Sequence, residues 1–300
     1  MIKSGRFYPK GCNSADKRLR YYAENFPLVE VSSSYYGLPS VANSELWAQR
    51  TPSGFTFNIK AFRLFTGHKT EVRVLPPPVR DHLPPVLSAK KSIGYRDVPE
   101  ELLDLLWQFF IDALQPLQQA GKLGLVHFQF TPSLTYSEDA LEYVTECRRR
   151  MSKFAMSTEF RHYSWLSREH CKRTLEFERE HDLVHTVVDA PQGFANTVRA
   201  CWEVTHPGVA LVRLHGRNKA TWNSRSGSAS DRFNYDYSDD ELGELTAPIE
   251  MVAGQAPTVH VIFNNNYEDQ GQRNAQTLTR LLRSARVSGG GGGNRTRVRE

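Results

Sequence analysis

Ionisable and amide side chains gather near the ends of the segments of this chain that are predicted to be β-strands. Successive residues of a strand point to opposite faces, so polar residues at every second position lie on one side. Two segments, residues 154–161 and 210–217, carry such a polar face. Its members are Ser157, Glu159 and Arg161 in the first segment and Arg213, His215 and Arg217 in the second. If parallel strands present these faces at their carboxyl ends, the side chains meet at one mouth, where we predict a functional site.

Acid/base chemistry on a small polar or anionic ligand, sugar-like or phosphorylated, is the function that this set predicts first. A carboxylate such as Glu159 beside arginines has the residue types for exchanging a proton with a polyol or sugar. The candidate catalytic residues are Glu159, His215 and Lys60. The residues near strand ends that we expect to bind the substrate are Glu30, Ser32, Gln129, Arg161, Arg213, Arg217, Asn264 and Asn265.

Binding without turnover is an alternative function for the same residues. Arg213, Arg217 and Lys60 offer charge-assisted donors, which predict a phosphate or carboxylate ligand. Nucleic acid is a second possible partner, because bases stack on aromatic side chains that lie near cations. The aromatic residues of that interpretation are Trp222, Tyr235 and Tyr237.

A divalent metal and a purely structural role are the two remaining alternatives. The oxygen and nitrogen ligands that a metal could use are Glu30, Glu159, Asp189 and His185, although no compact metal-binding motif is present and the cofactor is left unknown. The pairs Glu30–Lys60 and Glu159–Arg213 are also what a buried ion network without a function would contain.

Seven strands and eight helices are predicted to position these residues. The strands span residues 28–33, 54–60, 123–130, 154–161, 183–189, 210–217 and 257–264. The helices span residues 15–26, 43–50, 99–119, 137–152, 191–203 and 270–285, and two more begin at the N-cap residues Ser167 and Ser238. Their alternation favours a parallel sheet. Because no strand precedes the first helix, we predict the α/β class and a TIM-like (β/α)8 barrel that lacks its first strand.

Two long connections follow strand ends, where barrel proteins carry their functional loops. Residues 62–98 are rich in proline, and we expect them to form an ordered cover. Residues 217–238 contain a serine-rich stretch, and for residues 223–231 a lid and disorder are alternative predictions.

The composition, 39% hydrophobic and 24% charged over 300 residues, is that of a soluble globular protein. Residues 283–300 hold five arginines and one glutamate, and so account for four of the five net positive charges. We predict one domain over residues 1–286 and a Gly/Arg-rich disordered tail over residues 287–300, for which a nucleic-acid-binding arm is the alternative. The four cysteines are scattered, which predicts reduced thiols of a cytoplasmic protein. Neither a membrane segment nor a signal peptide is predicted.

A series of short motifs stands along the chain in a fixed order. The motifs are Phe7-Tyr8-Pro9, Tyr21-Tyr22-Ala23, Val29-Glu30-Val31-Ser32-Ser33-Ser34-Tyr35-Tyr36, Trp47, Thr51-Pro52-Ser53-Gly54-Phe55, Lys60-Ala61, Thr66-Gly67-His68, Gly121-Lys122-Leu123-Gly124, Gln129-Phe130, Leu214-His215-Gly216-Arg217-Asn218, Tyr235-Asp236-Tyr237 and Phe263-Asn264-Asn265. With them the chain resembles the domain-of-unknown-function family 72 (DUF72), also called YecE-like, from about Gly5 to about Leu282.

The resemblance implies a TIM-like barrel with the motif residues at its mouth, and a fold-level analogy to sugar isomerases. It adds His68, Asn218 and Tyr235 to the residues expected to bind the substrate. The family opens with a Gly-Thr-Ser-Gly-Trp type strand that is absent here. We therefore expect that Met1 is not the natural start or that residues 2–8 replace the strand poorly, and a truncated, inactive member is an alternative. Asn266 also stands where the family often has histidine, and Thr131 where it often has proline.

Overall fold

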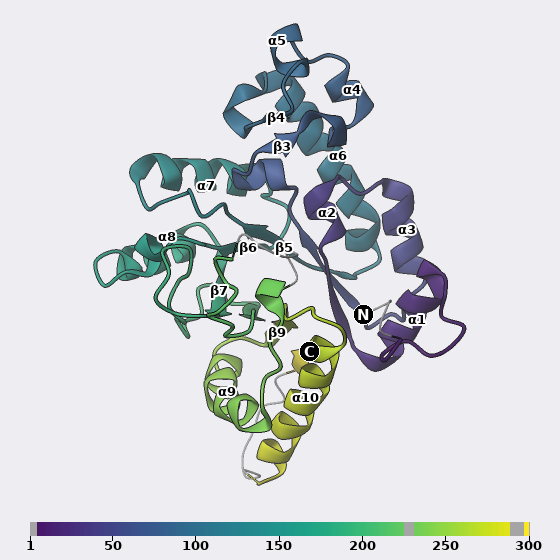
Figure 1. Ribbon diagram of the computed structural model, residues 1–300, viewed down its shortest axis with the longest axis vertical. Helices are drawn as coiled ribbons and strands as arrows, with labels where there is room; N and C mark the ends of the chain where they lie inside the picture. Colours follow the sequence, from purple (N-terminus) through teal and green to yellow (C-terminus); the bar gives the residue numbers. More distant parts are fainter. Residues whose placement is uncertain (1–4, 225–230, 289–296, 300) are drawn as a thin grey trace. The chain divides into compact units, whose positions relative to one another are not determined.

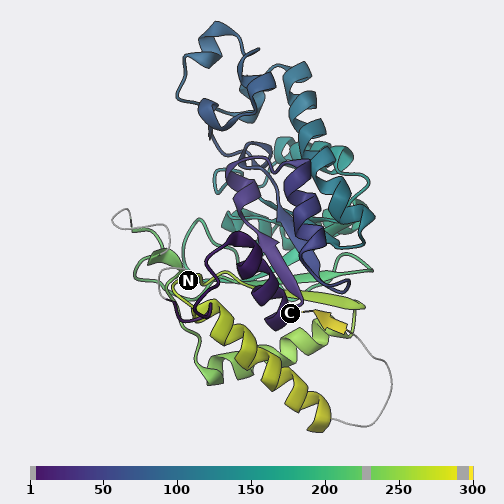
Figure 2. The same cartoon turned by 90° about the vertical axis from the view of Figure 1, so that its right-hand side faces the viewer.

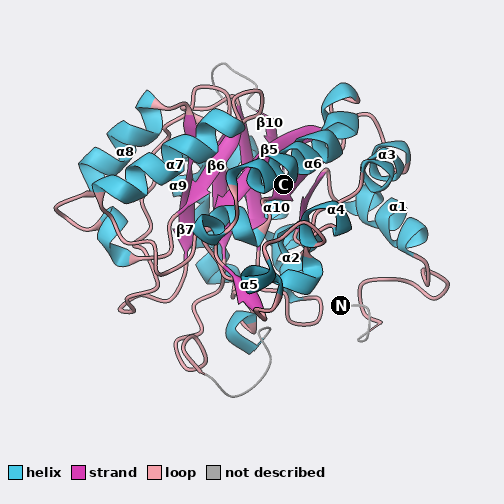
Figure 3. Ribbon diagram, turned by 90° about the horizontal axis from the view of Figure 1, so that it is seen from above, coloured by secondary structure: helices cyan, strands magenta, loops and turns pink. Residues whose placement is uncertain are grey.

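The computed structural model describes residues 5–224, 231–288 and 297–299 (Figure 1). The chain forms two compact units, one of Tyr22–Arg161 and the other of Met1–Tyr21 with His162–Glu300. Strands and helices alternate along the chain in both units, and Figure 3 colours the two kinds of element differently. Whether residues 1–286 behave as a single domain stays a prediction.

A four-stranded parallel sheet is the framework of the unit Tyr22–Arg161. Its strands, in spatial order, are β1 (Leu28–Val31), β2 (Thr56–Lys60), β5 (Leu123–Gln129) and β6 (Met156–Glu159). Neighbours in the sheet are neighbours in the sequence of long strands, which is the order of a (β/α) barrel. The register pairs His127 with Ser157 and Gln129 with Glu159, so four polar residues come together at the ends of β5 and β6.

Helices connect these strands. They are α1 (Ala15–Asn25), which precedes β1, α2 (Ser33–Tyr36), α3 (Val41–Gln49), α6 (Glu100–Gln119) and α7 (Glu138–Arg150). Helix α6 buries one face at helical spacing, and its Trp107 ring stacks on Phe65 with centroids 3.8 Å apart. Helix α7 begins where the Ser137 hydroxyl accepts a hydrogen bond from the Ala140 N–H, as the sequence predicts for an N-cap.

The segment between β2 and α6 folds into small elements of its own, drawn together at the top of Figure 1. They are η1 (Arg63–Thr66), β3 (Thr70–Glu71), η2 (Val72–Val74), α4 (Pro77–Arg80), α5 (Pro85–Ser88), β4 (Ser92–Ile93) and η3 (Tyr95–Asp97). The strands β3 and β4 pair antiparallel, and the buried Val79 and Ile93 give the segment apolar contacts. The predicted order of residues 62–98 is therefore confirmed.

The second unit is also built on parallel strands. They are β7 (Leu183–Asp189), β8 (Ala210–Leu214), β9 (Thr258–Phe263) and β10 (Arg297–Arg299), in that order. Its helices are η4 (Tyr163–Leu166), α8 (Cys171–Glu180), η5 (Asp231–Phe233), α9 (Asp239–Ala253) and α10 (Gln270–Ser288). Helices α9 and α10 lie side by side (Figure 2), and their apolar residues join those of β8 and β9 in one core.

The C-terminal segment is described only in part. Helix α10 continues to Ser288, and Arg297–Arg299 form β10, which pairs in parallel with β9 (Figure 2). The remaining residues of the predicted tail lie outside the described part, so its disorder stays a prediction. Most of residues 223–231, the predicted lid, lie outside it as well. In the described residues no helix is long and apolar enough to cross a membrane.

The predicted fold class, an α/β TIM-like barrel without its first strand, is confirmed. All seven predicted strands are present, shorter by a few residues at most at either end, and no strand precedes α1 in the described residues from Gly5 onward.

The helix predicted over residues 191–203 is wrong. That segment is irregular, because the Gln192 side chain bonds the carbonyls of Ala190 and Val198, and Gly193 has a φ of +98°. The prediction of Ser167 as an N-cap is also wrong, because α8 begins at Cys171 after the N-cap residue His170. Ser238 caps α9 in a capping box, as predicted.

Candidate functional site

The carboxylate of Glu159 is the centre of the candidate site in the unit Tyr22–Arg161. Glu159 ends β6 and is fully buried, and the parallel register sets it beside Gln129 at the end of β5. The amide of Gln129 donates to Glu159 Oε1 over 2.6 Å, and Lys60 Nζ donates to Gln129 Oε1 over 2.8 Å. Three strand ends, those of β2, β5 and β6, therefore converge on one hydrogen-bonded chain.

Two further groups approach the same carboxylate. His127 Nε2 lies 3.4 Å from Glu159 Oε2, and Arg161 Nη1 lies 3.6 Å from Oε1. The other ring nitrogen of His127, Nδ1, is 2.9 Å from Ser157 Oγ, which fixes the orientation of the imidazole. A buried carboxylate is stable only when it is paired and hydrogen-bonded, and these contacts supply both.

Two cations lie against the ring of Tyr35, and one of them is Lys60 of the chain that reaches Glu159. Lys60 Nζ lies 4.8 Å and the Arg63 guanidinium 5.4 Å from the ring centroid, both in cation–π range. Arg63 Nε is buried and has no hydrogen-bond partner among the described residues. His68 packs edge-on against Tyr35. Burial, and then Arg63, Lys60 and Arg161, lower the pKa of His68 to about 4, so its imidazole is neutral at pH 7.

The predicted substrate-binding residues Glu30, Ser32 and His68 lie in three different environments. Glu30 lies on β1, in register with Asn58. Ser32 is exposed and stands at the N-cap position of α2, where its side chain makes no capping bond. His68 Nδ1 is 2.9 Å from Thr66 Oγ1, and the threonine hydroxyl also donates to the Arg63 carbonyl. His68 thus lies beside the cations at Tyr35.

A second polar cluster, in the other unit, forms around Asp189 at the end of β7. Arg217 Nε lies 3.1 Å from both oxygens of Asp189, and its Nη1 is 3.4 Å from Glu241 Oε1. The Tyr237 hydroxyl donates to Asp189 over 2.6 Å and accepts from the Gly216 N–H over 2.9 Å. Burial would lower the pKa of Arg217, but Asp189 raises it above its usual value. Two carboxylates thus already neutralise the arginine that was predicted to bind an anion.

The other predicted residues of this unit take part in hydrogen bonds around the ends of β8 and β9. His215 Nδ1 is 2.8 Å from Asn264 Nδ2, and His215 Nε2 is 3.5 Å from Arg213 Nη1. Asn265 Nδ2 donates to the Tyr235 carbonyl, and Asn218 Nδ2 donates to the Asn234 carbonyl. These two amides hold the loop before α9.

The aromatic residues proposed for base stacking are mostly buried. Trp222 is 0% and Tyr237 is 3% exposed, so neither ring can take a base on its face, and the interpretation is wrong for both. The Tyr235 hydroxyl donates to Glu241, and burial, followed by Glu241, raises its pKa to about 12. Among the described residues no group of three or more His, Cys, Asp or Glu side chains could hold a metal ion.

Tyr35 and Arg63 are residues that the sequence analysis did not assign to the site. It gave no separate role to His127 or to Ser157, a member of the predicted polar face. Arg63 stands three residues after Lys60, in the 3-10 turn η1 that follows β2. There the alternation of a strand no longer predicts in which direction a side chain points. His127 and Ser157 do follow the period-two pattern, since they lie two residues before Gln129 and Glu159 on the same strand faces. That spacing is the signal that places both residues on the polar faces of their strands.

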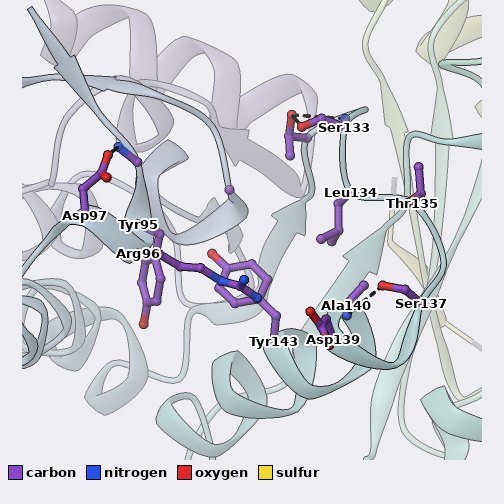
Figure 4. A pocket seen from close by; sticks show the side chains of 13 residues that line it. Tyr95, Arg96, Asp97, Ser133, Leu134, Thr135, Ser137, Asp139, Ala140 and Tyr143 are labelled. Atoms are coloured by element: carbon purple, nitrogen blue, oxygen red, sulfur yellow. Dashed lines mark hydrogen bonds between the residues drawn. The ribbon is translucent and has the colours of Figure 1, made fainter.

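A separate cavity of about 420 Å³ lies beyond the end of β5 (Figure 4). Its polar lining includes Tyr95, Arg96, Thr131, Asp139 and Tyr143. Hydrogen bonds orient two of its side chains. Tyr95 Oη accepts from the indole N–H of Trp107, and Tyr143 Oη donates to the carbonyl of Phe65. None of the predicted site residues is among its described lining residues.

Comparison with known proteins agrees with this architecture. The family model described as "Protein of unknown function DUF72" matches residues 2–292. UPF0759 protein YunF of Bacillus subtilis is 30% identical over 272 residues, which cover 90% of this chain and 88% of that protein. A crystal structure of a DUF72 family protein from Enterococcus faecalis has a TM-score of 0.73 at 26% identity and covers 88% of both chains. Another, from Thermotoga maritima, has a TM-score of 0.69 at 26% identity and covers 93% of this chain and 94% of that one. The chain belongs to the DUF72 family.

Proposed function

We propose that this chain binds a small anionic molecule, sugar-like or phosphorylated, and acts on it by acid/base chemistry at Glu159. The observation that carries the proposal is the pair of cations at Tyr35, where Lys60 and Arg63 lie against one ring. Arg63 Nε is a buried donor without a partner among the described residues, and such a group is costly unless a ligand accepts from it. A phosphate or carboxylate is the acceptor that guanidinium groups bind best.

Glu159 has the surroundings of a proton carrier. Gln129 and His127 hold its two oxygens from different sides, which fixes the direction of the carboxylate. Because Ser157 in turn orients the His127 ring, His127 is a positioning residue in this proposal. Lys60 is joined to the Glu159 carboxylate through the side chain of Gln129. A ligand bound at Lys60 would therefore be separated from the proton-transfer group by that one side chain.

A panel of ligands tests this proposal by thermal stabilisation, because a ligand that binds only the folded state raises the melting temperature. The panel contains inorganic phosphate, sugar phosphates, sugar acids and the corresponding neutral sugars. Stabilisation by the anionic compounds alone is expected, and Arg63→Met should remove it. Equal stabilisation by neutral and anionic compounds, or an unchanged response of Arg63→Met, would contradict the anion site.

Turnover is tested separately on whichever compound binds. Its conversion is followed by NMR with the wild-type chain, with Glu159→Gln and with Glu142→Gln as a matched control on the exposed face of α7. We expect Glu159→Gln to bind the compound and lose at least ~100-fold in rate, the usual effect of removing a general acid or base, and Glu142→Gln to keep the full rate.

Anion binding without turnover is the second candidate function, and the same cations favour it. It would be supported if the compound bound and remained unconverted by the wild-type chain while Arg63→Met still abolished binding. Glu159 would then serve to pair Arg161 and His127 within the unit.

A further inference from the structure

Two cysteines that are far apart in the sequence face one another in the second unit. The sulfurs of Cys171 and Cys201 are 3.9 Å apart, close to van der Waals contact. Cys171 stands in the first turn of α8 and is 8% exposed, whereas Cys201 is partly exposed and belongs to the irregular segment between β7 and β8. One cysteine is thus partly exposed, and the other is buried with its sulfur close to that of the first.

A buried ion pair lies next to this thiol pair. His185 Nδ1 is 2.9 Å from Glu178 Oε2, and both side chains are almost completely buried. Burial by itself lowers the pKa of His185, but Glu178 and the adjacent Cys201 thiol outweigh it and raise the pKa to about 10. The imidazole is therefore a cation at pH 7.

We propose that Cys171 and Cys201 form a redox-active thiol pair that is oxidised reversibly to a disulfide by a hydroperoxide. Cys201 is the attacking thiol, because it is the more exposed of the two. Cys171 is the resolving thiol. The Arg199 side chain hydrogen-bonds the Cys171 thiol, although burial raises the pKa of that thiol overall.

The reaction balances with hydrogen peroxide as the oxidant. The Cys201 sulfur attacks one peroxide oxygen, the O–O bond breaks, and a sulfenic acid and one water form. The Cys171 sulfur then attacks the sulfenic sulfur, the S–O bond breaks, and a second water leaves as the S–S bond forms. The two thiols lose two protons and two electrons in total. The sulfurs must approach from 3.9 Å to about 2.05 Å for the bond to form.

Thiol counting on the intact chain tests the proposal. The chain is reduced with dithiothreitol, freed of it, exposed to hydrogen peroxide, denatured and alkylated, and its mass is then measured. We expect two of the four cysteines to escape alkylation, and dithiothreitol to restore all four. Tryptic peptides of residues 169–172 and 200–213 should be found linked to one another.

Serine variants identify the pair. Cys171→Ser and Cys201→Ser should each abolish the protection, whereas Cys12→Ser, a partly exposed cysteine outside the pair, should leave it unchanged. Alkylation of all four cysteines after peroxide, or a linked peptide containing Cys12 or Cys147, would overturn the proposal. The peptide map of the wild-type chain decides alone if a serine variant does not fold.

Discussion

Replacing Gly216 by alanine should destabilise the fold by an amount that can be separated into two parts. Gly216 follows His215 and has a φ of +83°, a conformation that costs an L-residue roughly 1–2 kcal/mol. An added Cβ would also lie 2.5 Å from the Cβ of Tyr235, which is fixed to the backbone and cannot swing away. Overpacking of this kind costs about 1–3 kcal/mol. The expected loss in the free energy of unfolding is therefore about 2–5 kcal/mol.

Gly121→Ala is the matched control for the contact with Tyr235. Gly121 has a φ of +65°, and no atom lies within 4 Å of a Cβ added there, so only the backbone term of roughly 1–2 kcal/mol applies. Urea unfolding, followed by circular dichroism and by tryptophan fluorescence, measures both variants. If Gly216→Ala loses no more stability than Gly121→Ala, the close approach of Tyr235 has no energetic weight and the reasoning fails.

Three further predictions rest on buried polar groups. In NMR titration His68 should show a pKa near 4. Because this pKa lies below the unfolded value of about 6.5, the contribution of His68 to stability is complete above pH 6.5 and is lost as the pH falls towards 4. An observed pKa of 6 or more would contradict the prediction. Glu178→Gln should lower the free energy of unfolding by about 3–5 kcal/mol, because it leaves the His185 cation buried without its carboxylate. The control Glu176→Gln, which removes one partner of an exposed ion pair, should lower it by only about 0–1 kcal/mol. Tyr237→Phe should cost about 1–3 kcal/mol in chemical denaturation by leaving Asp189 and the Gly216 N–H without the hydroxyl they share, and unchanged stability would show that water replaces it.

The sequence by itself determined the strands, most of the long helices and the strand-end position of the candidate site residues. Periodicity and capping are local properties, so the seven strands, the α7 N-cap Ser137 and the α9 N-cap Ser238 follow from neighbouring residues alone. The same alternation placed Gln129 and Glu159 at strand ends, where the structure joins them.

Only the tertiary structure decided which side chains meet. Registers between strands brought Lys60, Gln129 and Glu159 into one hydrogen-bonded chain, although 69 and 30 positions separate the bonded pairs. Folding also buried Trp222, which the sequence places only in a long connection between elements. Contacts of this range depend on how the elements pack against one another, and no pattern within a few residues of Cys171 encodes that Cys201 will lie against it.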